Sequence, residues 1–95
     1  MSFYTYIVAS RRNGTLYTGS TDDIGKRVGE HRDKVRPGFT AKHGVAILVW
    51  FEGHETREAA FKRERQIKEW KRNWKLEMIE RSNPGWDDLF PSLFV

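Results

Sequence analysis

Residues 3–20 read FYTYIVASRRNGTLYTGS, and this stretch decides the fold. Phe3–Ala9 is rich in aromatic and β-branched residues, a composition that favours an extended strand. The pair Asn13-Gly14 follows and favours a tight turn, because glycine tolerates positive φ angles. Thr15–Ser20 then returns to strand composition. We therefore predict a β-hairpin that carries Tyr6 on its first strand and Tyr17 on its second.

Two helices and one further strand are predicted after the hairpin. Hydroxyl and carboxylate caps at residues 20–23 begin a helix that we expect to end near Asp33. Residues 35–44 are typical of a loop, and Val45–Phe51 is an apolar run of strand length. Glu52–Glu55 is expected to turn the chain. A long helix, capped by Thr56, is then predicted to continue to about Lys75.

Composition excludes several classes of protein. The chain has 95 residues, of which 38% are hydrophobic and 32% charged, so one folded domain is expected rather than disorder. The absence of cysteine excludes disulfide scaffolds and thiolate metal sites. The longest apolar run, Val45–Phe51, is far shorter than the ~20 residues of a membrane-spanning helix. We expect a cytoplasmic protein that does not enter membranes.

Charge is divided unevenly along the chain. Residues 1–75 carry 16 basic and 9 acidic side chains, whereas residues 76–95 carry 1 and 4. A basic body is typical of proteins that bind nucleic acid, although an ordinary surface also tolerates such an excess. The candidate phosphate-binding residues are Arg11, Arg12, Lys26, Arg32, Lys34, Arg36, Lys42 and Lys68.

One carboxylate interrupts an apolar face of the long predicted helix. Helical spacing places on one stripe the residues Ala60, Glu64, Ile67, Trp70 and Trp74. Four of them are apolar, so the stripe is expected to face the core. A buried carboxylate must be paired or bound to a cation, because burial of an isolated charge is costly. Glu64 is therefore either the partner of a Lys or Arg, or a metal ligand or catalytic group.

The last residues are too apolar for a free tail. Residues 82–85 read Ser-Asn-Pro-Gly and stop any further helix. Trp86, Leu89 and Phe90 follow, and they are expected to pack back onto the domain; the alternative is an exposed patch that docks a partner or a second copy. We expect a single domain, 1–95, with a core at about 3–81 and a C-terminal segment at 82–95.

The ordered set of motifs resembles the GIY-YIG nuclease superfamily, and especially its small stand-alone bacterial members. The first motif reads Tyr4-Thr5-Tyr6 and the second Tyr17-Thr18-Gly19. Arg27 and His31 follow on the next predicted helix, and Glu64 on a later one. The resemblance covers nearly the whole chain.

This resemblance implies an α/β (α+β) fold, a three-stranded antiparallel sheet flanked by helices. It also implies hydrolysis of DNA phosphodiester bonds with one divalent metal, Mg²⁺ or Mn²⁺, held by Glu64. By motif position, Tyr17 would be the general base or would position the attacking water, and Tyr6 would orient that water or the phosphate. Arg27 would stabilise phosphoryl charge, and His31 stands where some members carry Tyr.

Two residues depart from the family pattern. Tyr4 replaces the glycine of the first motif, and Ser20 stands where the excision-repair nucleases carry a lysine that can assist deprotonation of the tyrosine. We expect a monomer that binds DNA without sequence preference, with a partner protein as a further possibility, and with a structure-specific role in repair or recombination. The alternatives are a catalytically silent nucleic-acid-binding module and a protein-interaction domain.

Overall fold

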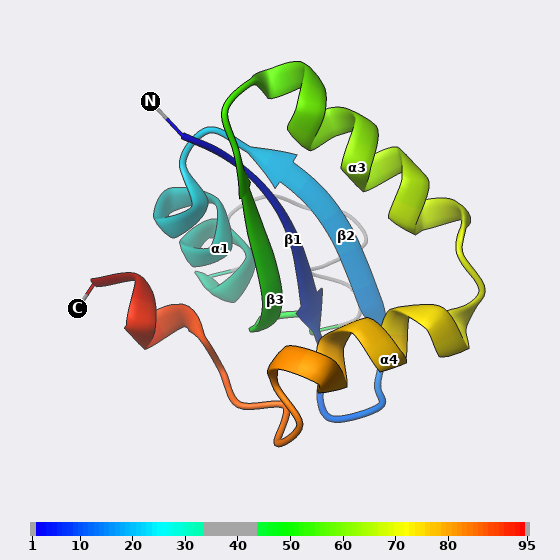
Figure 1. The fold of residues 1–95 in the computed structure, drawn as a ribbon. Coiled ribbons are helices and arrows are strands. Elements are labelled where there is room, and N and C mark those ends of the chain that lie inside the picture. Colours follow the sequence, from blue (N-terminus) through cyan, green and yellow to red (C-terminus); the bar gives the residue numbers. More distant parts are fainter. Residues whose placement is uncertain (1, 34–43, 95) are drawn as a thin grey trace.

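The computed structural model describes residues 2–33 and 44–94 and shows an α+β domain (Figure 1). Three antiparallel strands in the order β2-β1-β3 form the sheet, with helices on both faces. The elements are β1 (Phe3–Ala9), β2 (Leu16–Thr21), α1 (Ile24–Asp33), β3 (Ile47–His54), α3 (Arg57–Glu69), α4 (Arg72–Ser82) and the 3-10 helix η1 (Phe90–Phe94). Within the described ranges, no helix is both long and apolar enough to cross a bilayer.

The hairpin of β1 and β2 forms where the sequence predicts it. Tyr6 pairs with Gly19, and Val8 pairs with Tyr17. In the turn the left-handed residue is Asn13, with φ 56°, rather than its neighbour Gly14. Gly14 is needed for space instead, because a Cβ there would lie 2.3 Å from the Ser10 hydroxyl. The Asn-Gly pair therefore makes the expected turn, but Asn13 supplies the positive φ angle and Gly14 the space that a side chain would fill.

The sheet separates two apolar clusters. On one face, Ile7 and Ala9 of β1 pack against Ile67 of α3 and Ile79 of α4. On the other face, Tyr6 and Val8 pack against the two buried apolar residues of α1, Ile24 and Val28. Because side chains alternate along β1, one central strand supplies both clusters.

Strand β3 runs from Ile47 to His54, so it begins and ends later than predicted, and Glu52 lies on the strand rather than in a turn. Its pairing with β1 contains a bulge between Ile7 and Val8. The amide of Asn83 donates to the Val49 carbonyl at this irregularity, at 3.1 Å. Most of the loop predicted at 35–44 lies outside the described residues.

The prediction of one long helix to Lys75 is wrong. Helix α3 is capped by the Thr56 hydroxyl and ends at Glu69; Trp70 and Lys71 are extended, with ψ near 150° (150° and 149°), before α4 begins. Trp74 is 55% exposed, so the apolar stripe does not continue to it. The break lets α4 lie across the sheet and place Ile79 in the core. Arg72 fixes this position by donating to the Asn13 and Gly14 carbonyls at 2.8 and 2.7 Å.

The segment after α4 returns to the sheet. Trp86 is only 5% exposed, and its indole N–H donates to a Glu80 carboxylate oxygen at 2.8 Å. Further along, the Leu89 N–H donates to the Leu48 carbonyl at 2.8 Å, and the Leu48 N–H donates to the Asp88 carboxylate at 3.2 Å. These bonds satisfy part of the outer edge of β3, which would otherwise be open to pairing with another chain.

Candidate active site

Two strands and one helix bring three aromatic side chains together. Tyr6 of β1 and Tyr17 of β2 project toward His31 of α1, with ring centroids 5.8 and 5.4 Å from the imidazole. The Tyr6 hydroxyl lies 2.9 Å from His31 Nε2. His31 is buried because it shares one face of α1 with Ile24 and Val28, as the periodicity predicts. The two motif tyrosines therefore meet at a histidine, beneath the first helix.

Arg27 lies one turn before His31 on α1 and also reaches Tyr6. Burial raises the pKa of Tyr6 to about 12, although a hydrogen bond with the Arg27 guanidinium opposes that rise. The same hydrogen bond raises the pKa of Arg27. At neutral pH the site therefore holds a phenol and a guanidinium in contact, and Tyr6 keeps its proton.

Arg27 also has a donor left over. Its Nε is buried and has no hydrogen-bond partner among residues 2–33 and 44–94. Glu30 lies 3.7 Å from the same guanidinium, at Nη1. A small polar pocket of about 140 Å³ opens beside it, and its charged lining consists of two cations and three carboxylates: Lys26, Arg27, Asp22, Asp23 and Glu30. The Arg27 side chain lines this pocket, whereas its unused Nε–H is covered by protein and could reach a ligand only if the side chain moved.

Glu64 approaches from α3 on the opposite side of the edge strand β2. Its carboxylate accepts a hydrogen bond from the Ser20 hydroxyl at 2.6 Å and pairs with the Lys68 ammonium at 2.7 Å. Its side chain is only 12% exposed. Of the two sequence interpretations, the ion pair is therefore present. The pair does not exclude a cation, because Lys68 is 45% exposed and can leave the carboxylate.

Lys68 links Glu64 to the tyrosines. Its Nζ lies 5.5 Å from the centroid of the Tyr17 ring. Tyr6 in turn lies close enough to Tyr17 and Glu64 for both to raise its pKa slightly. All five motif residues therefore surround one edge of the sheet, at β2: Tyr6, Tyr17, Arg27, His31 and Glu64.

The donors at this edge fit a hard divalent cation held by few protein ligands. Mg²⁺ takes oxygen ligands and keeps several waters, so one carboxylate with substrate phosphate can suffice. Within the described part of the chain, no group of three or more acidic or histidine side chains could hold a metal by itself. Glu64 is the carboxylate among the motif residues, with the Ser20 hydroxyl beside it.

The candidate phosphate-binding residues are placed unevenly. Arg11 and Arg12 are exposed at the hairpin turn, and Lys26 is exposed on α1. Arg32, by contrast, pairs with Asp88 and lies 4.6 Å above the Phe90 ring, so it holds the C-terminal segment. Lys34, Arg36 and Lys42 fall outside the described residues.

Sequence reasoning missed two contributions to the site. In the sequence, Ser20 is only a departure from the family lysine, yet its hydroxyl donates a hydrogen bond to Glu64. Lys68 is predicted to contact phosphate, yet its ammonium lies beside both Glu64 and Tyr17. The four-residue spacing of Glu64 and Lys68 on a helix was a usable signal for the ion pair. No local pattern indicates the bond from Ser20, which lies 44 residues away.

Comparison with known proteins identifies the family of this chain. A family model described as the GIY-YIG catalytic domain matches residues 2–77, and the chain belongs to this family. It is 39% identical over 77 residues to the UPF0213 protein HQ_3675A of Haloquadratum walsbyi, covering 81% of this chain and 85% of that protein. It is 37% identical over 76 residues to the UPF0213 protein CPE1444 of Clostridium perfringens, with coverage of 80% and 81%.

A solved structure shares the architecture. The solution NMR structure of the UPF0213 protein BH0048 from Bacillus halodurans superposes with a TM-score of 0.57 and 25% sequence identity, over 93% of each chain. The small bacterial relatives expected from the sequence are therefore found, and the α+β fold with three antiparallel strands is confirmed. The family implies nuclease chemistry, while the names of these relatives state no activity.

Proposed function

We propose that this chain is a metal-dependent endonuclease that hydrolyses phosphodiester bonds in DNA without sequence preference. The observation that carries the proposal is the gathering of five motif residues around one edge of the sheet. Tyr6 and His31 are in direct contact, and Glu64 is tied to Tyr17 through Lys68.

The raised pKa of Tyr6 indicates that the two tyrosines have different roles. Because Tyr6 stays protonated at neutral pH, it serves as a hydrogen-bond donor or a positioning group rather than a base. Tyr17 is more exposed and has the Lys68 ammonium over its ring, so we assign it the activation or positioning of the attacking water. His31 holds both rings in place.

Arg27 is assigned to the phosphate. A guanidinium beside the reacting group opposes the negative charge that grows on the phosphate oxygens in the transition state. Its place in the wall of the adjoining polar pocket supports this assignment. Glu64, with Ser20 as its hydrogen-bond partner, would hold Mg²⁺ or Mn²⁺, and a bound cation there would supply further charge stabilisation.

A cleavage assay on single-stranded, duplex and branched DNA tests the proposal. We expect cleavage with Mg²⁺ or Mn²⁺, its loss on chelation, and its loss in Glu64→Gln, which keeps the size of the side chain and removes its charge. Glu58→Gln is the matched control, because Glu58 is exposed in the first turn of the same helix. It should cleave as the wild type does.

The other outcomes are informative. Cleavage that survives Glu64→Gln would point to a contaminating nuclease and would remove the catalytic assignment. Binding of all three DNA forms without cleavage would identify a silent nucleic-acid-binding module. If the chain neither binds nor cleaves DNA, the protein-interaction domain is the remaining alternative. Its basic surface would then be expected to bind an acidic protein.

A further inference from the structure

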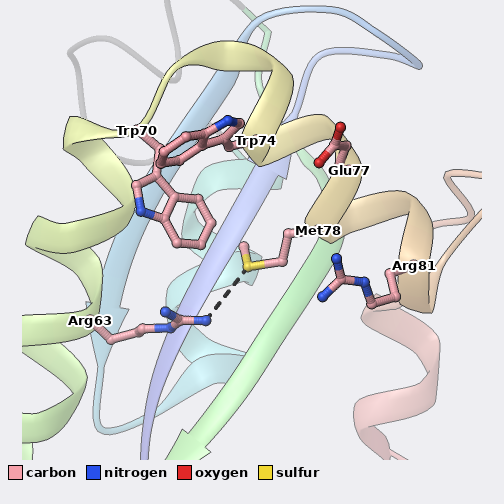
Figure 2. Close-up of a pocket in the computed structure, with 6 residues that line it drawn as sticks. All are labelled: Arg63, Trp70, Trp74, Glu77, Met78 and Arg81. Atoms are coloured by element: carbon pink, nitrogen blue, oxygen red, sulfur yellow. Dashed lines mark hydrogen bonds between the residues drawn. The ribbon is translucent and has the colours of Figure 1, made fainter.

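A second pocket lies where α3 meets α4, away from the catalytic edge. Figure 2 shows this corner pocket, of about 340 Å³, and its lining residues: Arg63, Trp70, Trp74, Glu77, Met78 and Arg81. Glu64 bonds to Ser20 on the edge strand β2, whereas Arg63 bonds to Glu52 on β3, at the other edge of the sheet. The proposed catalytic chemistry therefore does not account for the corner pocket.

Two indole rings form one wall of the corner pocket. The centroids of Trp70 and Trp74 are 6.2 Å apart, and the rings meet edge to face at 74°. Trp74 is 55% exposed, whereas Trp50 and Trp86 are 7% and 5% exposed. A large aromatic ring that is left half in water beside a pocket offers a flat face for a ligand.

Arg63 is fixed as the opposite wall. Its Nε donates to Glu52 at 3.1 Å, one terminal nitrogen donates to Gln66 at 2.7 Å, and the other lies 3.8 Å from the Met78 sulfur. The guanidinium carbon is also 5.3 Å from the Trp70 ring centroid. These contacts order the pocket before any ligand arrives, which lowers the entropic cost of binding.

Charge indicates what the corner pocket accepts. Its lining carries two arginines, Arg63 and Arg81, and one carboxylate, Glu77. Arg81 is exposed and makes no ion pair within residues 2–33 and 44–94, so its charge is available. The excess favours an anionic occupant.

We propose that the corner pocket binds an unpaired nucleotide of a single-stranded DNA segment, with the base stacked on Trp74 and a neighbouring phosphate paired with Arg81. Aromatic rings beside basic side chains are the combination by which proteins hold single strands without sequence preference. Bases inside a duplex are already stacked and cannot reach the ring. The proposal rests on the proposed nuclease function only in that the strand would belong to the substrate.

Binding measured without metal tests this proposal separately from catalysis. The wild-type chain in chelator is titrated with a short oligothymidylate strand and with a blunt duplex, and fluorescence anisotropy of the labelled DNA is followed. We expect Trp74→Ala to weaken strand binding about 5- to 150-fold, the range of base stacking on one aromatic ring, and to leave duplex binding unchanged. Trp74→Phe should keep most of the affinity, and Arg81→Ala should reduce the salt slope by about 1.

Phe61→Ala is the matched control. Phe61 is 50% exposed on α3, the helix that supplies Arg63, and it also lies beside an arginine, with the Arg65 guanidinium carbon 5.8 Å from its ring, but it is outside the corner pocket. It should leave strand binding unchanged. An equal loss in Phe61→Ala, or an equal loss on strand and duplex in Trp74→Ala, would overturn the proposal.

Two further results would assign the pocket to another occupant and also overturn it. One is that Trp74→Ala loses binding to a polyglutamate peptide but keeps binding to oligothymidylate. The other is a dimer in sedimentation that this substitution abolishes. If the chain cleaves DNA but strand binding does not depend on Trp74, the proposed nuclease function stands and the proposed nucleotide site is wrong. If strand binding depends on Trp74 but no DNA is cleaved, the nucleotide site stands and the proposed nuclease function is wrong.

Discussion

The ring of Tyr6 lies against the backbone of Gly19, its cross-strand partner in the hairpin. A Cβ at Gly19 would stand 2.5 Å from the Tyr6 hydroxyl oxygen and 2.7 Å from Cζ. Tyr6 is fully buried and cannot move aside. The glycine of the second motif is therefore required by the tyrosine of the first, which couples the two motifs sterically.

Gly19→Ala should therefore lower the free energy of unfolding by about 1–3 kcal/mol, the usual cost of overpacking a filled core. Gly29→Ala is the control, since a Cβ at Gly29 on α1 meets nothing within 4 Å. That substitution should be neutral or stabilise by up to about 1 kcal/mol through helix propensity. Urea unfolding of the two variants measures the difference, and equal effects would show that Tyr6 does not constrain Gly19.

The raised pKa of Tyr6 predicts a loss of stability at high pH. Its folded-state pKa is about 12 against an ordinary value of 10.0, so the unfolded chain loses the proton first as pH rises. Stability is full below pH 10 and falls as pH rises toward 12, by about 2–3 kcal/mol in all. Urea unfolding at successive pH values should show this loss in the wild type, beyond that in Tyr6→Phe. Parallel curves for the two proteins would contradict it.

Local patterns predicted the elements that local interactions determine. Strand composition and the Asn13-Gly14 pair were enough for the hairpin, and Glu64 was visible because it interrupted an apolar stripe. The break at Trp70 was not predictable, because no glycine or proline marks it. It depends instead on Arg72 binding the hairpin carbonyls, a contact across 58 and 59 residues. The partners of Glu64 were likewise only partly predictable. The ion pair with Lys68 on the same helix could be predicted from the spacing, whereas the hydrogen bond from Ser20 could not.

Salt dependence should identify which basic residues meet DNA. If about four to six side chains contact phosphates, log K for a duplex should fall with log salt at a slope of about −3 to −5. Arg11→Ala and Lys26→Ala should each reduce this slope by about 1. Arg32→Ala should leave the slope unchanged and lower the melting temperature, because Arg32 is engaged with Asp88 and Phe90. A slope that changes with Arg32 alone would reverse the assignment.

The Lys68–Glu64 ion pair should compete with a divalent cation. Lys68→Met removes the ammonium that lies 2.7 Å from the carboxylate, so Mn²⁺ should bind several-fold more tightly. Calorimetric titration of Mn²⁺ without DNA measures this directly, and Glu64→Gln should abolish the signal. Lys62→Met controls for net charge, because a residue two positions from Glu64 on a helix does not face it. Equal affinities in the two lysine variants would show that the ion pair has no effect on the metal.

Trp86 and Trp74 should differ sharply in their contribution to stability, although the segment around each is equally aromatic. Trp86 is 5% exposed, packs in the cluster with Ile79 and donates to Glu80, so Trp86→Ala should cost about 3–5 kcal/mol. Trp74 is 55% exposed, so Trp74→Ala should change stability by less than about 1 kcal/mol. Thermal unfolding at several protein concentrations measures both. A concentration-independent loss in Trp86→Ala alone is the result expected of a ring that closes the core, whereas a loss that vanishes on dilution would mean that Trp86 is buried by association.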